Sequence, residues 1–350
     1  MMVIEPFEHE HYDGQDGPRL LADIGGTNAR FALERGPGRI DAVATLPCAA
    51  YPRFADAVRD YLGRHPGTRV RHAAIAIANP VDGDLVKMTN HAWEFSIAQA
   101  RAALGLDTLL VVNDFAALAM SVPQLAPSDL AQVGGGAPVA DGVIGLVGAG
   151  TGLGVAGLIP SGGQWTVLQS EGGHAAFSPC DAREQAILDF CWQRWEHVSA
   201  ERLVSGPGLS LIHEALAAIK GLRTPVLDPA DIVERALDGK DALCAEVLEV
   251  FCGVLGTVAA NVAVTLCARG GIYIGGGVVP RLGEWFKRSP FRARFENKGR
   301  FSSYTARIPC FVIHAPCPAL AGAAALLEQH LARQAEHARR HGTEARHAHA

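Results

Sequence analysis

The sequence predicts an α/β protein made of two related halves, each a mixed β-sheet covered by helices. A short apolar strand, a glycine-rich turn and a second apolar strand occur at residues 20–33 and again at 143–159. Each of these units is followed by alternating strand-like and helix-like segments, which is the order expected of α/β domains. The length of 350 residues also exceeds that of a usual single domain. A repeat of this kind favours two domains with a ligand bound between them.

The first half begins with the hairpin, whose glycines are expected to adopt the positive φ angles of a tight turn. Three strands, then a helix, a strand, a helix, a strand and a helix are predicted after this, which gives a mixed sheet. The helix that follows Ser96 takes that residue as its N-cap. The two strands of the hairpin are expected within 20–33, the first from Leu20 to Asp23 and the second around Phe31–Leu33. The other expected strands are 40–46, 72–78 and 109–112, and the expected helices are 51–64, 97–105 and 115–120.

The second half repeats the strand-turn-strand unit and continues with helices and two late strands. Val250–Ala268 is uncharged and long, but its small and polar residues favour a buried helix and not a membrane span. Residues 1–18 and 336–350 are expected to be disordered extensions. The expected strands are 143–147, 155–159, 271–274 and 308–314; the expected helices are 183–195, 208–220, 229–237, a long one ending near 269, one after Pro280, and 319–331.

Composition excludes several classes of protein. The net charge is −5 and no basic block is interleaved with aromatic residues, so we expect no nucleic-acid partner. The eight cysteines form no Cys-x-x-Cys pair, which argues against a zinc site and a disulfide framework. Residues 1–18 lack the apolar core of a secretion signal. A reducing, cytoplasmic location and no membrane association are therefore expected.

The turn Asp23-Ile24-Gly25-Gly26-Thr27 is the first candidate for chemistry. Backbone N–H groups at such a turn can bind phosphate oxygens, Thr27 adds a hydroxyl, and Asp23 can hold a metal ion. An ordinary hairpin is the alternative. No P-loop motif exists, and the Gly-x-Gly-x-x-Gly pattern that begins at Gly152 is followed by a strand and a turn, so the dinucleotide interpretation fails.

Four other polar residues are candidates with two interpretations each. Asp114 ends a buried strand, where it can act as a general base or can cap the next helix. Glu171 and His174 lie in a Gly-Gly loop that is too polar to be core, and they can hydrogen-bond a polar ligand, although His174 is equally well an ordinary surface histidine. Glu201 also suits the first turn of a helix that Ser199 caps.

Three glycine clusters follow strands, at residues 23–27, 148–154 and 275–277. They resemble the phosphate-1, phosphate-2 and adenosine loops of the sugar kinase/actin/heat-shock ATPase superfamily. Within it, the chain resembles the bacterial glucokinase family over residues 20 to about 330. The matching segments, in the same order, are Met88–His91, Val112–Phe115, Glu171–His174, Ser199–Arg202 and Ser205–Gly208.

The resemblance implies a two-domain ribonuclease H-like/actin-like ATPase fold with an interdomain cleft, formed by residues 19–124 plus 315–335 and residues 125–314. It implies ATP-dependent phosphorylation of glucose at the 6-hydroxyl, with Asp114 as general base, and a homodimer. Mg²⁺ would be positioned by Asp23, through water. Glucose would be bound by Asn90, Asn113, Asp114, Glu171, His174 and Glu201. ATP would be bound by Ala22, Asp23, Ile24, Gly25, Gly26, Thr27, Gly150, Thr151, Gly152, Gly275, Gly276 and Gly277.

Two alternatives stay open. A kinase for another hexose or an amino sugar shares every nucleotide loop, and a non-catalytic sugar-sensing regulator is the rival from another class. The related repressor/open-reading-frame/kinase family places a cysteine-rich zinc motif shortly after the equivalent of Glu171–His174. Here only Cys180 follows, so we expect no zinc. The N-terminal extension is too short for a helix-turn-helix domain, which argues against the regulator.

Overall fold

A computed structural model describes residues 17–89 and 91–347. The chain divides into two compact units, one made of Met1–Leu125 with Pro316–Ala350 and the other of Ala126–Ala315. Each unit has its own large sheet and its own core. The interdomain cleft expected from the sequence stays a prediction.

The first unit has a five-stranded sheet with the order β3-β2-β1-β4-β7. β1 pairs with β2 antiparallel and with β4 parallel, and β4 pairs with β7 parallel, so the predicted mixed sheet is confirmed. Ile24, Ile77 and Asn113 lie in one register row, which places the carboxyl ends of three strands at the same edge. The strands are β1 Arg19–Ile24, β2 Asn28–Glu34, β3 Ile40–Pro47, β4 His72–Ile77, β7 Thr108–Asn113 and the separate pair β5 Leu85–Lys87 and β6 Glu94–Ser96.

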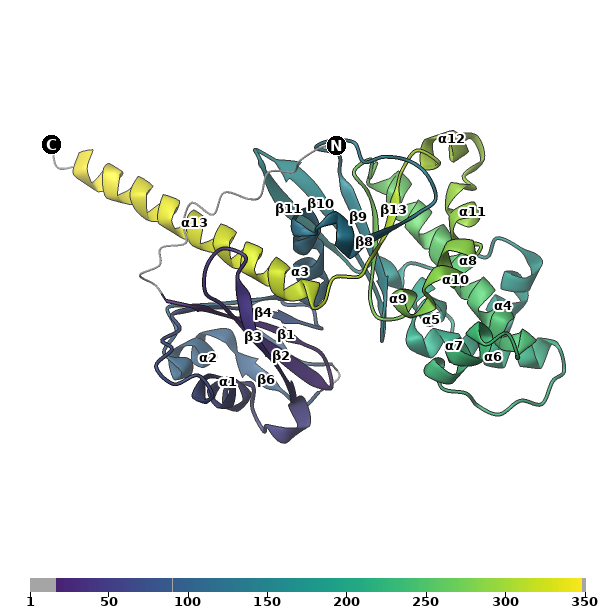
Figure 1. The fold of residues 1–350 in the computed structure, drawn as a ribbon, viewed down its shortest axis with the longest axis horizontal. Helices are drawn as coiled ribbons and strands as arrows, with labels where there is room; N and C mark the ends of the chain where they lie inside the picture. The colour runs from purple at the N-terminus through teal and green to yellow at the C-terminus, as the bar shows by residue number, and fades with distance from the viewer. Residues whose placement is uncertain (1–16, 90, 348–350) are drawn as a thin grey trace. The chain divides into compact units, whose positions relative to one another are not determined.

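Helices cover both faces of this sheet because its central strands are apolar on both sides. Along β1, Leu20 and Ile24 pack in one cluster with α1 (Phe54–Gly63) and α2 (Ile97–Leu104). Leu21 points to the other face, into a cluster with α3 (Asp114–Ser121) and α13 (Pro318–His347). Figure 1 shows these two pairs of helices on opposite sides of the sheet.

Helix α13 differs from the expected end of the chain. The sequence pattern places its end near Leu331 and disorder from residue 336, whereas the structure is helical to His347. The apolar periodicity stops near Leu331, but Ala, Glu, Gln and Arg favour helix without a packed face. An ion pair between Glu336 and Arg340, four residues apart, adds support on the exposed surface.

The second unit repeats the strand order of the first. Its sheet is β11-β10-β9-β12-β13-β8, in which β9 pairs antiparallel with β10 and parallel with β12. The first five strands therefore correspond to β3-β2-β1-β4-β7, which confirms the two related halves. The strands are β8 Leu130–Val133, β9 Ile144–Ala149, β10 Leu153–Ser161, β11 Gln164–Ser170, β12 Gly271–Gly275 and β13 Cys310–Ile313.

Helices of the second unit pack around the long helix α8, which is the core of this unit. α8 is long and apolar enough to cross a membrane, but 72% of its apolar window is buried inside the protein. Gly256 shows the close packing expected there, because a Cβ at this position would lie 2.4 Å from the carbonyl oxygen of Phe291. The helices are α4 Ala182–Trp192, α5 Ala200–Leu203, α6 Gly206–Ile219, α7 Pro229–Leu237, α8 Ala242–Thr265, α9 Val279–Leu282, α10 Glu284–Arg288, α11 Phe291–Glu296 and α12 Ser302–Thr305.

Candidate active site

The turn between β1 and β2 lies at the carboxyl edge of the first unit's sheet. The N–H group of Gly25 donates to the carbonyl oxygen of Asn28 at 2.9 Å, which closes the turn. Gly25 and Gly26 do not adopt a positive φ, so the expected reason for glycine here is wrong. A Cβ on Gly25 would make only an ordinary contact, at 3.7 Å from the Asn28 oxygen. Thr27 at the tip is exposed.

Asp23 is largely buried and forms an ion pair with Arg30, its cross-strand neighbour. Arg30 Nη1 lies 3.2 Å from Asp23 Oδ2, and the carboxylate side chain is 19% exposed. Burial raises the pKa of Asp23, and the Arg30 guanidinium opposes that rise. A cation beside this carboxylate therefore favours its ionised form. Asp23 is a single acid at a strand end, which suits a Mg²⁺ ion held mostly by water and phosphate oxygens.

Asn113 and Asp114 lie at the start of helix α3, one as its N-cap and the other as its first residue. Asn113 is the N-cap, and its Oδ1 accepts from the N–H groups of Phe115 at 2.9 Å and Ala116 at 3.1 Å. Asp114 is the first helical residue, where the positive end of the helix dipole favours a carboxylate. Its Oδ1 also accepts from Phe115 N at 2.8 Å. The cap that the sequence analysis assigned as an alternative role for Asp114 is thus supplied by Asn113.

Asn79 is a residue that sequence reasoning missed. Its carbonyl oxygen accepts from Asn113 Nδ2 at 3.3 Å. Its side chain donates to the Lys87 carbonyl at 2.6 Å and accepts from the Thr89 N–H at 2.9 Å. Asn79 follows β4 at the same sheet edge as Asn113, so a polar residue after a buried strand was the available signal. Asn90, a predicted sugar ligand, lies outside the described residues.

In the second unit, Gly150–Gly152 forms the turn between β9 and β10. Gly150 donates its N–H to the Gly152 carbonyl at 2.8 Å, and the Gly150 carbonyl accepts from Gly206 N at 2.7 Å. Gly206 opens helix α6, and Ser205 caps that helix by accepting from Gly208 N at 3.1 Å. The N-terminus of a fourteen-residue helix is therefore bound to the turn. The first N–H groups of α6 are thus bonded within the protein, and what this end offers an anion is the positive end of the helix dipole.

Glu201 joins the turn to the Glu171–His174 segment. Its Oε2 accepts from Leu153 N at 2.9 Å, and its Oε1 lies 3.6 Å from His174 Nδ1. The two segments also pair through backbone, since Ala200 N donates to the Ala175 carbonyl at 2.9 Å. Glu201 stands in the first turn of α5, as the alternative interpretation predicts, but Ser199 is the N-cap by position only and makes no side-chain cap bond.

Glu171 precedes the short 3-10 turn Gly172–His174 and is exposed. The backbone shape of this turn depends on glycine, because a Cβ on Gly173 would lie 2.0 Å from the Leu153 carbonyl oxygen. The turn therefore packs directly on the start of β10. The structure brings His174 and Glu201 together with the Gly150–Gly152 turn, with Glu171 at the start of the same segment.

Gly275 is the last residue of β12, and Gly276 and Gly277 begin the loop that lies beside the same turn. Gly275 is the register partner of Gly148, and Val278 N donates to the Ala149 carbonyl at 3.2 Å. Gly276 has φ +81°, and a Cβ there would lie 2.3 Å from the Ala149 oxygen. A hollow of about 360 Å³ begins next to this loop, lined by Leu209, Pro229, Ala230, Val233, Glu234, Leu237, Asp238, Val278 and Arg281.

The glycines of the three loops fall into two groups. Gly276 is required by its own φ and by packing, and a Cβ on Gly152 would lie 2.5 Å from Glu201 Oε2. Gly25, Gly150 and Gly277 have neither a positive φ nor a described neighbour that a Cβ would crowd. The fold does not demand glycine at these three positions. Close approach of a ligand to the backbone does explain it.

Among residues 17–89 and 91–347, no group of three or more His, Cys, Asp or Glu side chains is arranged to hold a metal ion. Asp23 is therefore a single candidate metal ligand. The expectation that the protein uses no zinc remains a prediction.

Comparison with known proteins shows which family this chain is similar to. The chain matches the glucokinase family over residues 20–330. It is 59% identical over 317 residues to the bifunctional protein glk of Burkholderia pseudomallei (strain 1710b), which covers 90% of this chain and 49% of the relative. It is 56% identical over 315 residues to the glucokinase of Chromobacterium violaceum, which covers 90% of each chain. The chain thus spans about half the length of the bifunctional relatives.

Two solved structures share the fold. A glucokinase from an Antarctic psychrotroph superposes with a TM-score of 0.82 at 35% identity, over 89% of this chain and 99% of the other. A ROK family glucokinase from Streptomyces griseus, in complex with glucose and AMPPNP, gives a TM-score of 0.63 at 20% identity, over 89% of this chain and 100% of the other.

The repeated mixed sheet, with a glycine turn after the first strand of each half, is the architecture of the actin-like ATPase superfamily. Asn113 and Asp114 lie at the carboxyl edge of the first unit's sheet, which is the edge where open α/β sheets bind ligands. The chain belongs to the glucokinase family.

Proposed function

We propose that this protein is an ATP-dependent glucokinase, which transfers the γ-phosphoryl group of ATP to the 6-hydroxyl of glucose. The observation that carries the proposal is Asp114, a carboxylate fixed at the head of α3 by the Asn113 cap in a chain of the glucokinase family. Relatives that are 56% and 54% identical over 90% of this chain are named glucokinases.

Asp114 acts as the general base in this proposal. Its carboxylate takes the proton of the glucose 6-hydroxyl while that oxygen attacks the γ-phosphorus. The bond from the γ-phosphorus to the bridging oxygen breaks, and glucose 6-phosphate and ADP are formed. Asn113 holds the backbone of Asp114 through two cap hydrogen bonds. Asn79 supports Asn113 through its carbonyl oxygen, so the base is positioned by three elements of the sheet edge.

The glycine loops bind the nucleotide. The N–H groups of Gly25 and Gly150 close their own turns, so the remaining backbone N–H groups of Gly25–Thr27 and Gly150–Gly152 take phosphate oxygens. Thr27 and Thr151 add hydroxyl groups. The three glycines that the fold does not require support this assignment. The hollow between Leu209, Val233 and Val278 is apolar on these sides and adjoins Gly275–Gly277, which suits an adenine ring. The glucokinase from Streptomyces griseus binds an ATP analogue, which supports the same donor here.

Asp23 positions Mg²⁺ through water. Mg²⁺ bound to ATP supplies the positive charge that stabilises the phosphoryl group during transfer. Asp23 contributes a carboxylate whose ionised form a neighbouring cation favours, as its contact with Arg30 shows.

Glucose hydroxyls are bound by Asn90, Asn113, Glu171, His174 and Glu201, in addition to Asp114. The contact of His174 with Glu201 supports a shared role for these two side chains. Carboxylates and imidazoles on neighbouring hydroxyls reject sugars that lack one of them. We also propose a cytoplasmic homodimer that uses no zinc and binds neither nucleic acid nor membranes.

A coupled assay tests the proposal with purified protein. Glucose, mannose, fructose and N-acetylglucosamine are compared, each with ATP and with polyphosphate. ADP formation that depends on glucose and exceeds the rate with the other three sugars is expected. A preference for another hexose or for the amino sugar would select the alternative kinase. No formation of sugar phosphate from any of the four sugars, with either donor, would favour the non-catalytic sugar sensor.

A further inference from the structure

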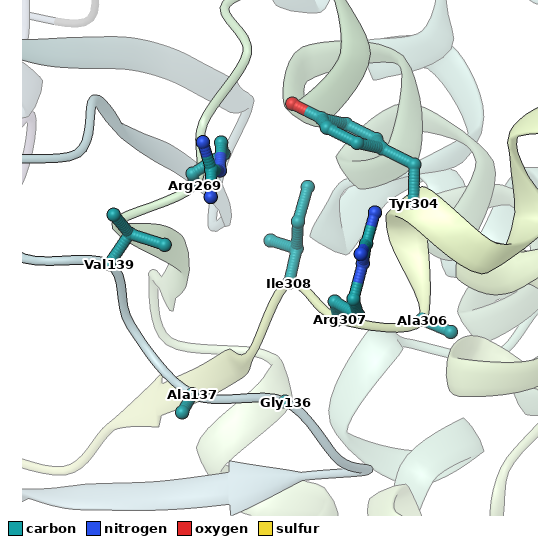
Figure 2. A pocket seen from close by; sticks show the side chains of 8 residues that line it. All are labelled: Gly136, Ala137, Val139, Arg269, Tyr304, Ala306, Arg307 and Ile308. Carbon is teal, nitrogen blue, oxygen red and sulfur yellow. The ribbon is translucent and has the colours of Figure 1, made fainter.

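A second cavity lies in the second unit, away from the glycine loops. Its volume is about 550 Å³, which is within the range of small-molecule sites. The α8–β12 connection contributes Arg269 and the α12–β13 connection contributes Arg307, at the amino ends of β12 and β13. β12 then runs five residues, roughly 16 Å, before it reaches Gly276 at its other end. The cavity is lined by Gly136, Ala137, Val139, Arg269, Tyr304, Ala306, Arg307 and Ile308 (Figure 2).

The walls of this cavity are fixed by hydrogen bonds and by a glycine contact. Val139 N donates to the Arg269 carbonyl at 2.9 Å, which joins two of the lining segments. Arg292 donates to the carbonyl oxygens of Ala306 and Ile308, each at 2.9 Å, and so holds the third lining segment, residues 304–308. Gly136 has φ +94°, and a Cβ there would lie 2.4 Å from the Arg307 oxygen, so this wall also requires glycine. The cavity is therefore built into the fold.

Arg269 and Arg307 give this cavity its positive charge. Both are exposed, and neither forms an ion pair with another described residue, whereas Arg292 is paired with Glu296 at 2.6 Å. None of the eight lining residues, all of them described, is acidic. Burial raises the pKa of Tyr304, and both guanidinium groups oppose that rise, so both charges act on the same side chain.

The remaining walls are apolar or aromatic. Val139 and Ile308 face the space between the two arginines, and the Tyr304 ring stands across from Arg269 (Figure 2). Arginine forks match the oxygens of a phosphate group, while aliphatic and aromatic walls suit an organic body attached to it. We infer that this cavity is a second ligand site, which binds a small organic phosphate between Arg269 and Arg307.

Binding is measured by isothermal titration calorimetry on the full chain. The probes are inorganic phosphate, glucose 6-phosphate and AMP; the last two distinguish a sugar phosphate from a nucleotide as the source of the phosphate. The proteins compared are wild type, the double variant Arg269→Gln/Arg307→Gln and the control Arg223→Gln. Arg223 is an exposed arginine in the α6–α7 connection that has no ion pair among the described residues.

We expect at least one organic phosphate to bind wild type and the control equally and the double variant at least tenfold more weakly. Binding at the proposed catalytic site is unchanged by these substitutions, so it appears equally in all three proteins. Circular dichroism verifies that the double variant is folded.

Identical titrations in wild type and the double variant would overturn the inference. So would a double variant that changes only the oligomeric state, because the cavity would then be covered by a second copy of the chain. Either result leaves the proposed kinase activity untouched.

Discussion

The three glycines that the fold does not require give the sharpest test of the nucleotide loops. Gly150 and Gly277 have open space around the position of a Cβ, and neither has a positive φ. Replacement by alanine at such sites stabilises a protein by about 0.4–1 kcal/mol, because the unfolded chain loses conformational freedom. The folded protein alone therefore predicts Gly150→Ala and Gly277→Ala to be neutral or slightly stabilising.

Catalysis predicts the opposite outcome for the same two variants. A methyl group at a backbone that contacts ATP moves an oxygen or ring of the nucleotide away from its N–H donor. Loss of one hydrogen bond to a charged group costs about 1.5–3 kcal/mol, which is roughly a 10- to 100-fold fall in kcat/KM for ATP. Steady-state kinetics with varied ATP and urea unfolding of the same preparations measure both quantities.

Gly276→Ala is the matched control within the same loop. A positive φ costs an L-residue about 1–2 kcal/mol, and the contact of 2.3 Å with the Ala149 oxygen adds to it. This variant is expected to lose stability as well as activity. If Gly150→Ala and Gly277→Ala keep the wild-type kcat/KM for ATP, the argument that these glycines admit the nucleotide is refuted.

Two further predictions concern the first unit. Folding raises the pKa of Asp23, so the stability from this group is present below its ordinary pKa of 3.8 and is lost as pH rises through the raised value. Arg30→Gln raises the pKa of Asp23 further, so the acid limb of the pH profile of kcat/KM should move to higher pH. Arg35→Gln is the control and should leave this limb in place. If the acid limbs of Arg30→Gln and wild type coincide, ionised Asp23 has no role in the reaction. Asn79→Ala removes the side-chain bonds to the segment before the predicted sugar ligand, so the KM for glucose should rise about tenfold with a smaller change in kcat. Asn79→Asp keeps the acceptor and should lose less, whereas equal kinetics in both variants would exclude this positioning role.

Local patterns were sufficient to predict most of the fold. The two strand-turn-strand units combine short apolar runs with glycine, and Ser96 does accept from Gln99 N as the predicted cap. β11 (Gln164–Ser170) was missed because its side chains are mostly exposed and polar. It is ordered by its antiparallel pairing with β10 across the two-residue turn Gly162-Gly163, a hairpin signal that was present in the sequence.

The candidate site shows the same division between local and long-range information. Asn113 and Asp114 were found because they end a buried strand. The sequence could not decide which of them caps α3, since that depends on side-chain geometry at one turn. Asn79 was missed because its role arises from the pairing of β4 with β7, which brings residues 34 positions apart into contact.

The turnover of Asp114→Asn tests the central claim most directly. Asparagine has nearly the same shape as aspartate but cannot accept the proton of the 6-hydroxyl. Loss of a general base typically lowers the rate by about 10²–10⁴-fold. Glucose binding, measured by calorimetry, should stay close to that of wild type while kcat falls by this factor. A variant that binds glucose and keeps the wild-type kcat would show that Asp114 is not the base.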